Sequence, residues 1–107
     1  MISNEQAEKA LMYLADSEEE YARYRGLKET EKERMKITHA SLTMDSREKT
    51  QGRQALDAYS SEDYIKSLEQ YHEVLEHFYL IDAKRKRAEI TVEVWRTEEA
   101  SRRRGNV

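Results

Sequence analysis

The chain has no cysteine and no proline, and only three glycines, one phenylalanine and one tryptophan. The lack of cysteine excludes a disulfide scaffold, a thiol nucleophile and a zinc–thiolate site, and it fits a cytosolic location. No apolar run approaches the roughly 18 residues that a membrane-spanning helix needs, so we expect no membrane partner. The opening residues also lack the basic and apolar regions of a signal peptide.

Length and polarity limit the core that the chain can form. Charged residues make up 38% of the 107 residues and hydrophobic residues 37%. A chain this small and polar buries only a thin core, which favours a hairpin, a small bundle or an oligomer over a thick globule. The sequence leaves open whether a homo-oligomer forms.

Charge alternates in sign along the chain. Residues 1–20 carry a net charge of −5 and residues 54–83 a net charge of −6, whereas residues 21–53 and 84–107 each carry +4. If the chain folds back once, each block lies beside one of opposite sign. Exposed ion pairs contribute only ~0.2–1 kcal/mol each, so this pattern selects an arrangement more than it stabilises one.

Two helices are predicted in the first half of the chain. The first covers about residues 4–15 and begins at a capping box, in which Gln6 reaches back to Ser3. Asp16 and Ser17 are expected to interrupt it and to cap a second helix, over about residues 17–43. Gly26 lies inside the second helix, as a surface glycine or, less favoured, as a point where another backbone approaches.

Residues that disfavour regular structure gather between positions 43 and 52, so we place a hairpin turn between Asp45 and Thr50, with Thr50 or Ser46 capping the helix that follows. Beyond it, apolar residues recur every three or four positions, which predicts a helix over about residues 51–104, continuous or joined near Asp82. Residues 90–95 alternate and are β-branched, as in a strand. Because no second strand exists to pair with them, we expect a helix.

These elements predict a single all-α domain over residues 1–107. We expect a long antiparallel helical hairpin with a short N-terminal helix folded over its far end. In this arrangement Ala88, Val92 and Trp95 face the first helix.

The titratable residues form no catalytic or metal-binding motif. Glu69 and His72 make one Glu-x-x-His unit, but a di-iron bundle needs two such units and further carboxylates. His72 and His77 are five positions apart and point to different helix faces. We therefore expect no enzyme activity, no cofactor and no metal. The seven tyrosines fall mostly on the apolar seams and are expected to pack there.

The strongest candidate for a binding surface is the basic C-terminal half. Its cations are diluted by glutamates, so nucleic-acid binding is the alternative rather than the leading hypothesis. We expect a protein partner to contact the following residues: Lys84, Arg85, Arg87, Trp95, Arg96, Arg102 and Arg103.

Three stretches of the sequence, residues 4–14, 58–64 and 84–107, resemble segments of small helical proteins encoded by tailed bacteriophages. The resemblance implies an early-region accessory protein near recombination or anti-defence functions, acting in the cytoplasm of a bacterial host. Together with the thin core, the many tyrosines, the polarised charge and the lack of a catalytic motif, it leads to the hypothesis of a non-enzymatic protein that binds a nuclease, a recombinase or a CRISPR-type immune effector. The alternative is a nucleic-acid-binding recombination accessory protein. The resemblance assigns no functional residue.

Overall fold

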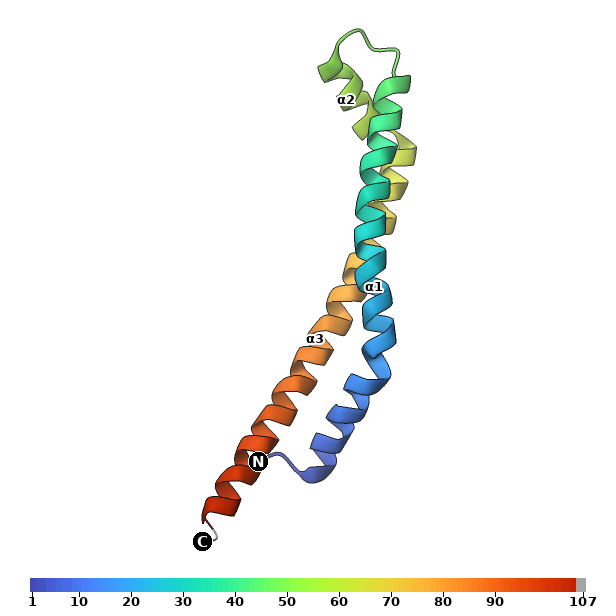
Figure 1. Cartoon of the computed structure of the whole chain (residues 1–107). Coiled ribbons are helices and arrows are strands. Elements are labelled where there is room, and N and C mark those ends of the chain that lie inside the picture. Colours follow the sequence, from blue (N-terminus) through green and yellow to red (C-terminus); the bar gives the residue numbers. More distant parts are fainter. Residues whose placement is uncertain (106–107) are drawn as a thin grey trace. The chain divides into compact units, whose positions relative to one another are not determined.

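The structure is a computed structural model that describes residues 1–105. It contains three helices: α1 over Asn4–Asp45, α2 over Gln51–Tyr59 and α3 over Glu62–Gly105. No strand occurs within residues 1–105. In Figure 1 the chain runs along α1, reverses, and returns antiparallel along α3. The predicted all-α helical hairpin is therefore confirmed, and so is the turn between Asp45 and Thr50.

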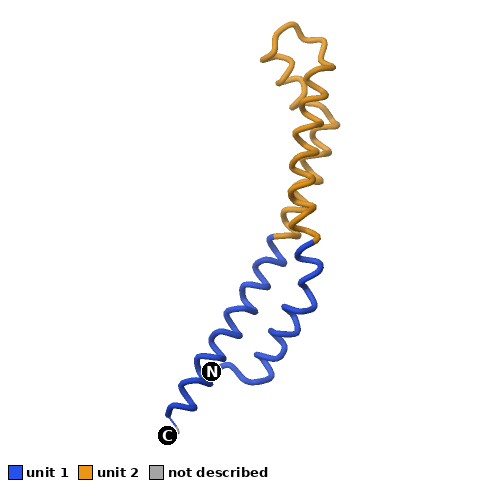
Figure 2. The backbone as a smooth tube through the Cα atoms, in the orientation of Figure 1, with its two compact units in different colours: residues 1–22, 79–107 blue, residues 23–78 orange. Residues whose placement is uncertain are grey.

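The chain divides into two compact units (Figure 2). Unit 1 combines residues 1–22 with the chain from residue 79 onward, and unit 2 covers residues 23–78. Each unit contains a segment of α1 packed against a segment of α3. Figure 1 also shows that the N-terminus lies beside the C-terminal half of α3 within unit 1.

The predicted capping box begins α1. The Ser3 amide donates to Gln6 Oε1 over 2.8 Å, and the Gln6 amide donates to Ser3 Oγ over 3.1 Å. These two bonds satisfy backbone donors that the first helical turn cannot pair internally.

The predicted break at Asp16 and Ser17 is wrong, because α1 continues through both residues. The Ser17 hydroxyl donates to the Tyr13 carbonyl over 2.6 Å, which is the back-bonding pattern of a serine inside a helix. Ser17 is also buried, at 6% exposure, where α3 supplies a further donor. A serine whose hydroxyl is engaged in this way has no reason to begin a new helix, so the predicted short N-terminal helix is the first part of α1.

The short helix of the fold is α2, and the predicted helix over residues 51–104 is two helices. The Thr50 side chain accepts from the Arg53 amide over 3.2 Å and caps α2, so of the two predicted caps, Thr50 and Ser46, it is Thr50 that caps the helix. The chain leaves helical geometry at Ser60 and Ser61. Ser60 Oγ donates to the Asp57 carbonyl, and Ser61 Oγ accepts from the Asp63 amide over 3.3 Å, which caps α3. Two consecutive hydroxyls offer the backbone these local alternatives to a continuous helix.

Four further predictions concern residues 90–95, Asp82, Gly26 and the end of the last helix. Residues 90–95 are helical, as predicted, and α3 runs without interruption past Asp82. A Cβ atom at Gly26 would meet nothing within 4 Å, so Gly26 is a surface glycine and no backbone approaches it. The sequence predicts that Gly105 and Asn106 end this helix; α3 is helical through Gly105, and Asn106 lies outside the described residues.

The core is thin in both units. In unit 1, Ala10, Ala88 and Val92 form a buried cluster, with Tyr13 and Leu14 packed against it. In unit 2, α2 contacts both long helices: the Tyr59 ring lies 3.9 Å from that of His39 on α1 and 5.2 Å from that of Tyr64 on α3, measured between centroids. Ala58, the neighbouring residue of α2, is 2% exposed. Three helical segments therefore enclose the core of unit 2.

Candidate partner-binding groove

A groove of about 420 Å³ lies between α1 and α3 in unit 1. Its lining residues come from both ends of the sequence and are Ile2, Gln6, Lys9, Ala10, Tyr13, Lys84, Arg87, Ala88 and Thr91. A hollow of about 500 Å³ elsewhere is lined by residues of α1 alone, so it is a depression along one helix rather than a space between elements. The unit 1 groove is the candidate site.

The floor of the groove is apolar and shallow because small residues meet there. Ala10 and Ala88 are 9% and 7% exposed and belong to the core cluster of unit 1. Two alanines leave space that larger side chains would fill, and Tyr13 borders this space with its ring. Ile2 borders the groove near its other end, held in place by a 3.0 Å hydrogen bond from its amide to Glu98 Oε2 on α3.

The rim of the groove is cationic. Lys9 stands on the α1 side, and Lys84 and Arg87 stand on the α3 side, with no acidic residue in the lining. Lys9 lies 3.5 Å from Glu5, but both side chains are at least three-quarters exposed, so this pair is weak. Within residues 1–105, neither Lys84 nor Arg87 forms a salt bridge. The rim can therefore accept negative charge from a ligand.

The structure places the predicted contact residues in two different settings. Lys84 and Arg87 are exposed and line the groove. Arg85 points the other way, into the seam between the helices. Its Nη1 atom donates to the Leu14 carbonyl over 2.8 Å and to Ser17 Oγ over 2.7 Å. Its guanidinium also lies 4.8 Å from the centroid of the Tyr21 ring.

Trp95 is also used within the chain. Its Nε1 donates to Asn4 Oδ1 over 2.8 Å, which ties α3 to the first residue of α1. The prediction that Trp95 faces the first helix is confirmed, and Ala88 and Val92 lie buried in the same seam. A tryptophan held in this way supports the hairpin.

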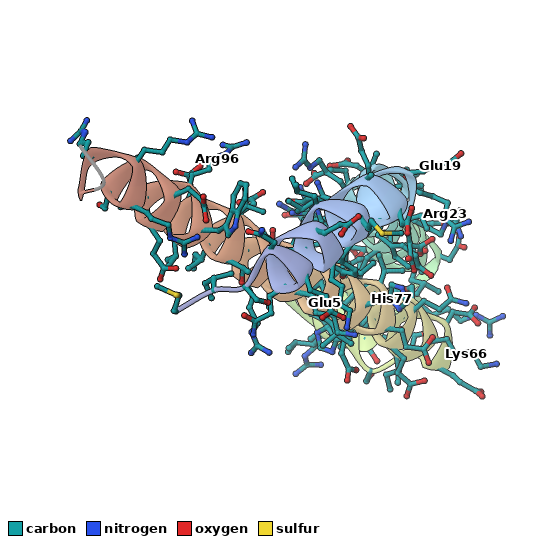
Figure 3. All side chains as sticks on the ribbon, turned by 90° about the horizontal axis from the view of Figure 1, so that it is seen from below. Glu5, Glu19, Arg23, Lys66, His77 and Arg96 are labelled. Atoms are coloured by element: carbon teal, nitrogen blue, oxygen red, sulfur yellow. The ribbon has the colours of Figure 1, made fainter. Side chains whose placement is uncertain are left out.

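The remaining predicted cations lie toward the end of α3. Arg96 projects outward from the helix (Figure 3) and pairs with Glu93 over 3.2 Å. Arg102 pairs with Glu99 over 2.9 Å, and Arg103 is exposed. Local pairs at i,i+3 spacing reduce the positive charge that this end of α3 presents to an anion.

Lys86 shows the same local neutralisation. Its ammonium lies 2.8 Å from the Asp82 carboxylate, one turn earlier. The hydrogen bond to Asp82 and the attraction of its charge raise the pKa of Lys86 above 10.5. Of the four consecutive bases at positions 84–87, two thus interact within the chain and two line the groove.

Sequence reasoning missed the residues that α1 contributes to the groove. Lys9 is the only basic residue among the acidic residues 1–20, so the charge pattern did not indicate a cationic site there. Tyr13 was expected only to pack in the apolar seam. The available signal was spacing, because Gln6, Lys9 and Tyr13 follow intervals of three and four, as residues on one helix face do. Only the pairing of α1 with α3 shows that this face adjoins Lys84 and Arg87.

The histidines lie in aromatic contacts. The His77 ring stacks on Tyr24 with centroids 4.0 Å apart, and His39 contacts Tyr59 and the Ala55 carbonyl. No group of three His, Cys, Asp or Glu side chains within residues 1–105 could hold a metal ion. Over the same range, no helix carries an apolar stretch long enough to traverse a lipid bilayer.

No protein-family model matches the chain, and comparisons with curated proteins and with solved structures also give no match.

Proposed function

We propose that this protein is a non-enzymatic accessory protein that binds an acidic, partly apolar segment of a partner protein in the unit 1 groove. The proposal combines the accessory role that the phage resemblance implies with one structural observation. That observation is an apolar floor of alanine and tyrosine beneath three cations, two of which lack a salt bridge within the described residues. The partner is a nuclease, a recombinase or an immune effector of the bacterial host or of the phage.

The composition of the groove supports a protein ligand over a nucleic acid. Nucleic-acid binding relies on many cations that follow a phosphate backbone. Here Lys86, Arg96 and Arg102 are each paired with a neighbouring carboxylate, and Arg85 faces the seam. An apolar floor gives no favourable contact to phosphate, whereas it suits aliphatic side chains of a protein.

Affinity capture from a bacterial lysate tests this function with three proteins. The first is the unchanged protein, the second is the charge-reversed K84E/R87E variant, and the third is K32E/K49E, which makes the same charge change on exposed residues outside the groove. We expect a partner that is retained by the first and third proteins and lost by the second. The captured partner is then purified, and its affinity is measured for all three proteins.

Two results would overturn the proposed function. One is a partner bound equally well by K84E/R87E. The other is that the unchanged protein captures no partner but binds single- or double-stranded DNA in a salt-sensitive way. That result would favour the recombination accessory role. Titration with both DNA forms at two salt concentrations provides that measurement.

A further inference from the structure

The two walls of the groove each repeat with the spacing of a helix-packing seam. On α3, Leu80, Lys84, Arg87, Thr91 and Val94 follow intervals of four, three, four and three. Such spacing places side chains along one stripe of a helix, as in the seam of a coiled coil. On the opposite wall, Gln6, Lys9 and Tyr13 of α1 follow intervals of three and four, and Ile2, which precedes α1, also lines the groove. Two such rows of side chains, one on each side of the groove, form a surface on which a third helix can pack.

Both walls are apolar at the ends and cationic in the middle. Leu80 is 55% exposed and Val94 is 40% exposed, and they lie one turn before and one turn after the groove-lining residues of α3. The opposite wall likewise has Ile2, just before α1, at one end and Tyr13 of α1 at the other, with Lys9 between them in the sequence. A complementary helix therefore carries apolar residues toward its two ends and carboxylates in its middle.

Unit 2 shows how this fold accommodates a third helix. There α2, nine residues long, contacts both α1 and α3 through Tyr59 and buries its own Ala58. In unit 1 the described residues supply only two helices, and its core cluster is open on the groove side. From Lys84 to Thr91 the groove extends about 10 Å at ~1.5 Å per residue, which two turns of a helix span.

We propose that the occupant of the groove is an amphipathic acidic helix of the partner protein, which completes a three-helix bundle in unit 1. This inference rests on the proposed function and specifies the segment that is bound. Lys84 and Arg87 are three positions apart, so carboxylates at i and i+3 or i+4 of the bound helix reach both of them. Lys9, across the groove, takes a carboxylate on the opposite flank of that helix. Leucine-sized residues between the two flanks rest on Ala10 and Ala88.

The probe is a designed peptide of about three heptads, long enough to form helix, with leucines on one stripe and glutamates on both flanks. Two matched peptides serve as controls. One replaces every glutamate with lysine, and the other places a proline at a central position and so interrupts the helix without changing the charge. Binding of fluorescently labelled peptides to the full chain is followed by anisotropy, and circular dichroism shows whether bound peptide becomes helical.

We expect the acidic helical peptide to bind, to gain helicity and to bind more weakly as salt is added. The K84E/R87E variant should lose at least about tenfold in affinity, because two attractive charges become repulsive. The K32E/K49E variant should bind like the unchanged protein. If K84E/R87E does not fold, as judged by its circular dichroism, the neutral K84Q/R87Q variant replaces it, with a smaller loss expected.

Other outcomes separate this inference from the function on which it rests. Equal binding of the proline peptide would overturn the helical occupant and leave an acidic ligand in the groove. Another outcome is a captured partner that binds the unchanged protein but not K84E/R87E, yet fails to displace the bound acidic helical peptide. That result would also overturn the helical occupant, while the proposed function would stand. Equal binding of the lysine peptide would overturn the acidic ligand and the proposed function together. Self-association in sedimentation that K84E/R87E abolishes would assign the groove to a second copy of the chain and overturn the inference.

Discussion

Arg85 provides the sharpest test of the fold, because the structure gives this cation a role within the hairpin. Its Nη1 donates to the Leu14 carbonyl and to Ser17 Oγ, and its guanidinium lies over the Tyr21 ring. The informative perturbation is Arg85→Met. It keeps much of the apolar stem of the side chain and removes the charge and the donors.

The expected change in the free energy of unfolding follows from the interactions that Arg85→Met removes and from the desolvation cost that it relieves. Hydrogen bonds from a charged donor contribute ~1.5–3 kcal/mol each, and a cation over an aromatic ring contributes ~0.5–1 kcal/mol. Against this, the Arg85 Nε atom is buried without a hydrogen-bond partner, which costs about 1–3 kcal/mol and is relieved by the substitution. Ser17 Oγ keeps its bond to the Tyr13 carbonyl, so no new group is left unsatisfied at that position. These contributions leave a net loss of about 0.5–6 kcal/mol in the free energy of unfolding, and we expect about 3 kcal/mol, near the middle of that range.

Urea denaturation followed by far-ultraviolet circular dichroism measures this loss. The control is Arg103→Met, an equivalent change at an exposed position, which should alter stability by less than about 0.5 kcal/mol. A double-mutant cycle with Ser17→Ala should give a coupling energy of about 0.5–1.5 kcal/mol, since the two side chains are bonded directly. If Arg85→Met costs no more than Arg103→Met, the described seam is incorrect and Arg85 is free to contact a partner.

Three further outcomes can be measured on the same chain. Gly26→Ala should raise the free energy of unfolding by about 0.5–1 kcal/mol in urea denaturation, because alanine favours the helix and its Cβ meets no neighbour; a loss would mean that another group packs there. Trp95→Phe should cost about 0.5–1.5 kcal/mol through the lost bond to Asn4, and this difference should disappear when Asn4 is already alanine, as thermal unfolding can show. Pairing with Asp82 raises the pKa of Lys86, so the pair stabilises the fold below pH 10.5, and this stabilisation vanishes as the pH rises through the raised pKa. Denaturation at several alkaline pH values should therefore show a decrease in the free energy of unfolding that the D82N variant lacks.

Local features of the fold were readable from the sequence because their causes are local. The Ser3 and Gln6 capping box, the Thr50 cap and the turn after Asp45 each depend on side chains within a few residues of the backbone groups that they satisfy. The helical state of residues 90–95 followed from an equally simple argument, the absence of any strand to pair with them. The recurrence of apolar residues every three or four positions likewise predicted the apolar face of the last helix, because this spacing depends only on neighbours along the chain.

The errors arose where local preference and tertiary contact compete. Asp16 and Ser17 have the composition of a helix boundary, but Ser17 is buried against α3 and bonded to Arg85, so the helix continues. Ser60 and Ser61 lie in a region whose periodicity predicts one helix, yet their hydroxyls bond to nearby backbone and α2 separates from α3. The same residue type thus continues one helix and ends another, according to what surrounds it.

The sequence alone determined that this protein is an all-α hairpin, because composition, capping residues and the period of apolar positions depend on neighbours along the chain. Tertiary structure alone decided which cations face outward. Lys84, Arg85, Lys86 and Arg87 are equivalent in sequence, but the position of α1 turns Arg85 into the seam and leaves Lys84 and Arg87 at the groove. Lys9 joins them only because residues far apart in the chain lie on facing helices, and this is why the groove appears only in the folded chain.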